Sequence, residues 1–96
     1  MGEWYLYVVR CQNGSLYTGI TMDVARRLAE HRDEKGKGAK YLRGRGPLTL
    51  ELQTKIGSRS LALAVEGQVK KLSKTGKEEL IRDDRAIEAI IKQASE

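Results

Sequence analysis

An expected β-hairpin near the N-terminus constrains the fold of this chain more than any other feature. Residues 4–9, with the sequence WYLYVV, are aromatic and β-branched, which favours a strand. Residues 16–20, LYTGI, can return as its antiparallel partner. Between them, Asn13-Gly14 is a strong hairpin signal because both residues tolerate positive φ angles. The first strand is apolar on both faces, so we expect it to be the central strand of a small sheet covered by helices.

A helix is expected next, over residues 24–31, with Asp23 as its N-cap. The positions i, i+3, i+4 and i+7 that define its buried face include Arg27 and His31. A guanidinium and an imidazole on an inward face cost free energy unless they have partners. The alternative is that the buried stripe ends early and both side chains extend to water. The helix alone leaves both interpretations open.

The remaining sequence predicts one more strand and three more helices. We expect a strand over 48–53, a helix over about 59–72 capped by Ser58 or Ser60, a short helix that begins with the capping-box sequence Thr75-Gly76-Lys77-Glu78, and a last helix over about 84–94 capped by Asp83 or Asp84. The 96 residues are expected to form one domain, 1–96, with its core at about 4–81. The expected fold class is α/β, with a three-stranded, mainly antiparallel sheet packed with helices.

The excess positive charge of this chain is confined to one segment. Its net charge is +5, and residues 24–46 contain eight Lys and Arg against three acidic residues, while the rest of the chain is balanced. A confined basic patch is expected where a protein binds a polyanion. The alternative, a solubilising surface, usually mixes both signs. The residues expected to contact nucleic acid are Arg26, Lys35, Lys37, Lys40, Arg43 and Arg45.

Other patterns argue against several classes of protein. No apolar run is long enough to span a bilayer, and no signal peptide precedes the first strand, so we expect no membrane partner. A single cysteine, Cys11, suits a buried thiol in a reducing cytoplasm. No Cys/His cluster accompanies His31, which disfavours a zinc site.

Two tripeptides and the helix after them resemble a known family. Tyr5-Leu6-Tyr7 and Tyr17-Thr18-Gly19, followed by Arg27 and His31, look like the GIY-YIG nucleases. More narrowly, RCQNGSLYTGIT over 10–21 and GKGAKY over 36–41 resemble the small bacterial UPF0213, or YhbQ-like, group. The likeness extends from about residue 4 to residue 81.

This resemblance implies a metal-dependent endonuclease that hydrolyses DNA, structure-specifically in repair or processing. It implies that Tyr17 acts as the general base or positions the water, that Arg27 contacts the phosphate, and that Glu66 binds a divalent cation, Mg²⁺ or Mn²⁺. It also implies that His31 and Tyr7 orient the water or the phosphate. Tyrosine is a weak base at neutral pH because its ordinary pKa is about 10. Positive charge is therefore expected close to Tyr17.

The sequence departs from the family pattern at several positions. Tyr5-Leu6 replaces the Gly-Ile of the first tripeptide, Thr18 replaces the Ile of the second, and no Asn follows Glu66. These departures keep a second function open: a non-catalytic or weakly catalytic nucleic-acid-binding accessory protein of the same fold. A purely structural interaction module is disfavoured by Arg27 and His31 on the inward face of their helix.

The loop of the hairpin decides whether the two tyrosines can share a site. A two-residue loop, the commonest kind, would pair Arg10 with Tyr17 and place Tyr7 and Tyr17 on opposite faces. A three-residue loop would pair Val9 with Tyr17, with Gly14 in the left-handed region of a G1-type bulge. Because a joint site requires both tyrosines on one face, we predict the three-residue loop.

Overall fold

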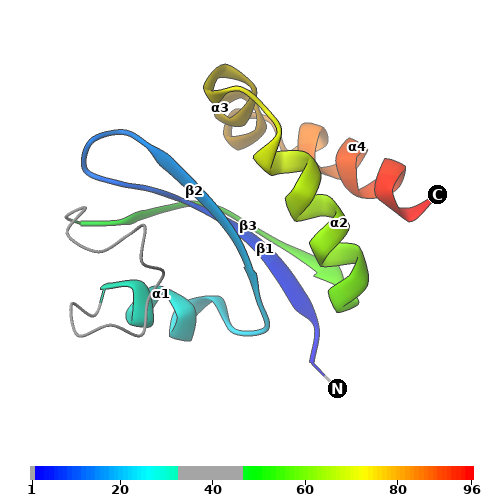
Figure 1. Cartoon of the computed structure of the whole chain (residues 1–96), viewed down its shortest axis with the longest axis horizontal. Coiled ribbons are helices and arrows are strands. Elements are labelled where there is room, and N and C mark those ends of the chain that lie inside the picture. Colours follow the sequence, from blue (N-terminus) through cyan, green and yellow to red (C-terminus); the bar gives the residue numbers. More distant parts are fainter. Residues whose placement is uncertain (1, 33–46) are drawn as a thin grey trace.

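The computed structural model describes residues 2–32 and 47–96, and shows a sheet with helices on both faces (Figure 1). The elements are β1 (Trp4–Arg10), β2 (Leu16–Thr21), α1 (Val24–Arg32), β3 (Thr49–Gly57), α2 (Arg59–Lys70), α3 (Lys74–Arg82) and α4 (Asp84–Ser95). The sheet order is β2-β1-β3 and both pairs are antiparallel, so β1 is central, as predicted. The expected fold class is therefore confirmed.

The hairpin between β1 and β2 has the predicted three-residue loop. Val9 pairs with Tyr17 and Tyr7 pairs with Gly19. The Cys11 amide donates to the Ser15 carbonyl at 2.8 Å, which closes the loop. Gly14 has a φ of 88°, in the left-handed region that glycine adopts without strain. Tyr7 and Tyr17 consequently lie on the same face of the sheet.

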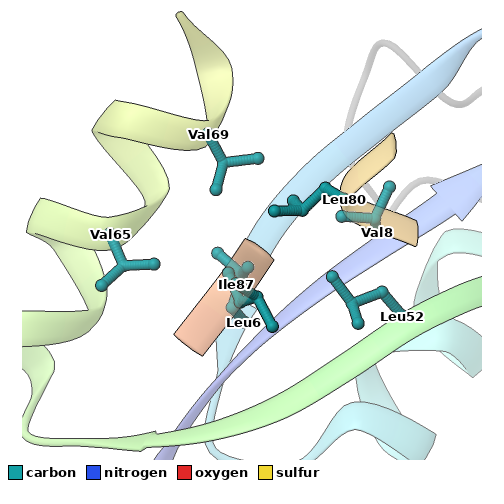
Figure 2. Close-up of a cluster of buried hydrophobic side chains, with 7 residues drawn as sticks. All are labelled: Leu6, Val8, Leu52, Val65, Val69, Leu80 and Ile87. Carbon is teal, nitrogen blue, oxygen red and sulfur yellow. The ribbon is translucent and has the colours of Figure 1, made fainter. Parts of the chain in front are cut away.

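The two faces of the sheet carry separate hydrophobic clusters. Figure 2 shows the first, where side chains of the sheet meet α2, α3 and α4: Leu6, Val8, Leu52, Val65, Val69, Leu80 and Ile87. The second lies on the face of α1 and contains Tyr7, Val9, Cys11, Val24, Leu28 and Leu48. Cys11 is a buried free thiol, as expected. None of the helices in the described ranges is both long and apolar enough to cross a membrane.

Most helix starts match the sequence predictions, and one does not. Asp23 accepts from the Arg26 amide at 3.1 Å, and of the alternatives at the other two starts, Ser58 caps α2 and Asp83 caps α4. The capping box predicted at Thr75 is wrong. Helix α3 begins earlier, at Lys74, because the hydroxyl of Ser73 accepts from the amide of residue 76 at 3.1 Å.

The glutamate of the predicted capping box serves a long-range contact instead. Glu78 accepts two hydrogen bonds from the guanidinium of Arg10, at 2.6 and 2.8 Å. Arg10 also donates to Glu51 at 2.6 Å. One β1 side chain thus ties β3 and α3 together, an arrangement that residue spacing within α3 cannot reveal.

Two element boundaries also differ from the prediction: β3 extends to Gly57 rather than ending at residue 53, and α2 ends at Lys70 rather than residue 72.

Candidate functional site

Tyr7 is the centre of the candidate site. It lies in the middle of β1, is 1% exposed, and its hydroxyl oxygen is 2.7 Å from Nε2 of His31 on α1. Its ring extends across the hairpin over Gly19, its partner on β2. A Cβ at residue 19 would come within 2.5 Å of Cζ of Tyr7. The glycine of the second tripeptide therefore leaves the space that the Tyr7 ring occupies.

The role of Gly19 was not recognised from the sequence. The strand register could have indicated it, because the three-residue loop that pairs Val9 with Tyr17 also pairs Tyr7 with Gly19. Thr18, the departure next to it, points away from the site. It pairs with Val8, whose side chain belongs to the cluster under α2, and it is 3% exposed.

Three rings of the predicted site lie together on the α1 face. The ring centroids of Tyr7 and Tyr17 are 6.5 Å apart, and the ring centroid of His31 is 5.8 Å from Tyr7 and 5.6 Å from Tyr17. His31 is only 5% exposed. Of the two interpretations of the α1 helix, the inward-facing one is correct for this histidine.

Arg27 is half-buried and held between two groups. Its Nη1 donates to Oε1 of Glu30 at 2.8 Å, one helical turn further along α1. Hydrogen bonding and charge also link its guanidinium to the Tyr7 hydroxyl. The guanidinium of Arg27 therefore lies close to the Tyr7 hydroxyl, and its positive charge acts on that group. Glu30 is a site residue that the sequence analysis missed, although its i, i+3 spacing from Arg27 was a readable signal.

Burial controls the protonation of Tyr7 and His31. Desolvation, with a further contribution from Tyr17, raises the pKa of Tyr7 to about 12, against a lowering by Arg27. Desolvation and then the charge of Arg27 lower the pKa of His31, against a raising by Glu30. At neutral pH the tyrosine therefore keeps its proton and the imidazole is uncharged. The Tyr7 hydroxyl can donate to Nε2 of His31, in the tautomer that carries its hydrogen on Nδ1.

Glu66 approaches the site from the other side of the hairpin. Helices α1 and α2 lie on opposite sides of it (Figure 1). The Glu66 side chain is 17% exposed and its Oε2 is 3.4 Å from Nζ of Lys70. Its negative charge is one of the smaller causes that raise the pKa of Tyr7, so the carboxylate lies within electrostatic range of that hydroxyl.

The donor groups near Glu66 suit a metal ion held partly by substrate and water, but not a metal site closed by protein side chains alone. No cluster of three or more His, Cys, Asp or Glu side chains occurs in residues 2–32 and 47–96, so these residues do not form a closed metal site. Mg²⁺, in contrast, is commonly held by one or two carboxylates, substrate phosphates and several waters. A single, largely buried carboxylate such as Glu66 fits this second mode.

The predicted nucleic-acid contacts can be placed only in part. Arg26 lies on α1 with its side chain 78% exposed, 3.5 Å from Glu30. The other five predicted contacts lie outside the described part of the chain: Lys35, Lys37, Lys40, Arg43 and Arg45.

Comparison with known proteins agrees with this arrangement. A model of the GIY-YIG catalytic domain matches residues 3–79. The UPF0213 protein of Cronobacter sakazakii is 53% identical over 90 residues, which cover 94% of this chain and 93% of that protein. The UPF0213 protein YhbQ of Salmonella typhimurium is 50% identical over 91 residues, which cover 95% of this chain and 89% of that protein.

Solved structures of relatives share the fold. The solution NMR structure of the UPF0213 protein BH0048 from Bacillus halodurans matches with a TM-score of 0.54 and 45% identity, over 83% of each chain. That of the protein EF2693 from E. faecalis matches with a TM-score of 0.62 and 35% identity, over 85% of each chain. GIY-YIG domains form a nuclease family that acts on nucleic acids and is generally metal-dependent. With its hairpin, its paired tyrosines and its Arg/His helix, the chain belongs to the GIY-YIG catalytic domain family, in its small UPF0213 group.

Proposed function

We propose that this protein is a metal-dependent endonuclease that hydrolyses DNA phosphodiester bonds. One observation carries the proposal: a guanidinium, an uncharged imidazole and a second tyrosine gather around Tyr7, with a largely buried carboxylate within electrostatic range. Phosphodiester hydrolysis requires these types of group, namely a donor to the phosphate oxygens, a group that activates water, and a ligand for a cation.

Arg27 is proposed to bind the non-bridging oxygens of the phosphate. Its planar guanidinium matches phosphate geometry, and its contacts with Glu30 and Tyr7 hold it in place before the substrate arrives. Preorganised donors of this kind stabilise the charge that develops in the transition state without reorganising.

Tyr17 is proposed to accept a proton from the attacking water, or to position that water. We do not assign this role to Tyr7, because its raised pKa, about 12, leaves even less phenolate at neutral pH than an ordinary tyrosine has. We assign to Tyr7 and His31 the orientation of the water or the phosphate, through the hydroxyl and imidazole that lie 2.7 Å apart.

Glu66 is proposed to hold the divalent cation, Mg²⁺ or Mn²⁺. The cation would stabilise negative charge on the phosphate and on the departing oxygen. Glu66 contributes the negative charge that selects a cation, while its ion pair with Lys70 gives it a positive partner in the free protein. The basic residues of segment 24–46 are proposed to hold the DNA backbone.

Cleavage assays on duplex, nicked, flapped and single-stranded DNA, with Mg²⁺ or Mn²⁺, test this proposal. Arg27→Ala should lower the cleavage rate by about a hundredfold or more, because removing one preorganised donor typically has this effect. Glu66→Gln should do the same while preserving the size of the side chain. Glu88→Gln, which changes an exposed carboxylate on α4, is the matched control and should leave the rate unchanged.

The result also decides between the two functions left open by the sequence. Metal-dependent cleavage that is lost in both site variants, with unchanged folding by circular dichroism, supports the nuclease. Wild-type protein that binds these DNAs without cleaving any of them would contradict the enzyme and support the accessory protein.

A further inference from the structure

A surface hollow of about 380 Å³ lies beside the candidate site and shares Arg27 with it. It is formed where β2 ends and α1 begins, and its lining includes Trp4, Ile20, Met22, Arg26, Arg27 and Glu30. Its volume falls within the range of small-molecule pockets, about 300–1,000 Å³. Ile20 follows Gly19 along β2, and its side chain lies on the opposite face, next to the cluster under α2. The hollow therefore adjoins the site through Arg27 of α1, not through the strand.

One wall of the hollow is apolar and partly aromatic. Trp4 and Ile20 are half-buried, and Met22 is 53% exposed, one of the two large hydrophobic side chains exposed in the described ranges. The guanidinium of Arg59, from α2, lies 5.6 Å from the centroid of the Trp4 ring. This cation–π contact places a further positive charge against the apolar wall.

The part of the lining that comes from α1 is charged. Arg26 extends into solvent, and Arg27 is the residue proposed above to bind phosphate. Glu30 is paired with both arginines, at 3.5 and 2.8 Å, so the carboxylate and the two guanidinium groups form one network. An apolar aromatic surface next to cationic side chains is complementary to a nucleotide, whose flat base stacks and whose phosphate is anionic.

We propose that this hollow binds one nucleobase of the DNA, belonging to the nucleotide next to the phosphate held by Arg27. The inference rests on the proposed function, because it uses Arg27 as the phosphate anchor. The base lies against Trp4, Ile20 and Met22, and the backbone passes Arg26 and Arg27. Arg27 thereby connects the phosphate site with the base site.

The tryptophan itself supplies the readout, because Trp4 is the only tryptophan in the chain. Two single-stranded oligonucleotides of equal length and charge are compared in EDTA, one with all its bases and one made entirely of abasic sugars. The oligonucleotide with bases should quench Trp4 fluorescence and bind about 5- to 150-fold more tightly, which is the effect of one base–aromatic stack. The abasic oligonucleotide should bind through charge alone and leave the fluorescence nearly unchanged.

Variants test whether this preference arises in the hollow. Trp4→Leu should reduce the ratio of the two affinities severalfold, and Met22→Ala, at an exposed position that is not needed for the core, should reduce it without removing the fluorophore. Leu63→Ala is the matched control, since Leu63 is the other exposed large hydrophobic side chain of the described ranges and does not line the hollow. It should leave the ratio unchanged.

The outcomes separate this inference from the proposed function. Equal affinity for both oligonucleotides would overturn the base site, and so would an affinity ratio that Met22→Ala and Trp4→Leu leave unchanged. In either case, salt-dependent binding and cleavage of DNA would still support the nuclease. Absence of binding to either oligonucleotide would overturn the base site, and the cleavage assays on duplex, nicked and flapped DNA would then decide on the nuclease independently.

Discussion

Replacing Gly19 with alanine should damage both the stability and the site of this protein, because the new methyl group would occupy the space of the Tyr7 ring. The added Cβ would lie 2.5 Å from Cζ and 2.9 Å from Cε1 of Tyr7, well inside van der Waals contact. Tyr7 is 1% exposed and packed in the cluster on the α1 face, so its ring cannot move aside without disturbing that cluster.

The expected cost follows from two contributions. Overfilling a packed core costs about 1–3 kcal/mol of unfolding free energy. A displaced Tyr7 hydroxyl would also lose its 2.7 Å contact with Nε2 of His31, and a typical hydrogen bond contributes about 1 kcal/mol. The sum is about 2–4 kcal/mol, which for a domain of this size corresponds to a fall in Tm of roughly 10–30 °C.

Chemical denaturation of four proteins measures this effect and its cause: wild type, Gly19→Ala, Tyr7→Leu and the double variant. The shorter leucine should make room for the new methyl, so the two substitutions should be strongly non-additive. Gly67→Ala is the matched control, because nothing lies within 4 Å of a Cβ built at that position of α2. It should stabilise the protein by up to about 1 kcal/mol through helix propensity. Additive costs for residues 7 and 19, or a neutral Gly19→Ala, would refute this account of the close approach.

The other predictions concern the core, the stability at acid pH and the basic patch. Thr18→Val should raise the free energy of unfolding by about 1 kcal/mol, because the buried Thr18 hydroxyl has no hydrogen-bond partner within the described ranges; a loss of stability in denaturant titrations would contradict this. Arg10 lowers the pKa of the Glu78 carboxyl, so the Arg10–Glu78 ion pair stabilises the fold at pH values above the ordinary carboxyl pKa. This stabilisation is lost as the pH falls through the lowered pKa of Glu78. In Arg10→Met, Tm should therefore decrease less than in the wild type between about pH 5 and pH 3. An unchanged dependence of Tm on pH would show that this ion pair does not contribute to acid unfolding. Alanine at Lys37, Lys40, Arg43 and Arg45 together should reduce the dependence of log Kd on log salt by about 0.7–0.9 per phosphate contact removed; an unchanged slope would place the DNA elsewhere.

Local sequence determined the secondary structure of this protein well, because the responsible forces act over a few residues. The Asn13-Gly14 hairpin signal and the helix after Asp23 were readable from neighbouring positions, and the caps of α2 and α4 were each narrowed to two residues, of which the structure has Ser58 and Asp83. Where a residue distant in the sequence competed for a side chain, the prediction from local sequence was wrong. The box that starts at Thr75 has the right spacing, but its Glu78 pairs with Arg10 of β1, and Ser73 caps α3.

The candidate site divides in the same way. The spacing of Arg27 and His31 showed that they share a helix face, and the family resemblance, rather than loop statistics, favoured the register that puts Tyr7 and Tyr17 together. Glu66 has no distinguishing feature along α2 and was found through the resemblance alone.

Only the tertiary structure decided which of these groups interact. It showed that the charge of Arg27 acts on Tyr7, that Glu30 holds Arg27, and that the ring of Tyr7 requires a glycine at position 19. These relations depend on how far a side chain reaches across the sheet and on how deeply it is buried. Hydrophobic periodicity indicates which face of a helix or strand a residue occupies. The partner that the residue meets there, and the desolvation that shifts the residue's pKa, depend on how strands and helices pack together.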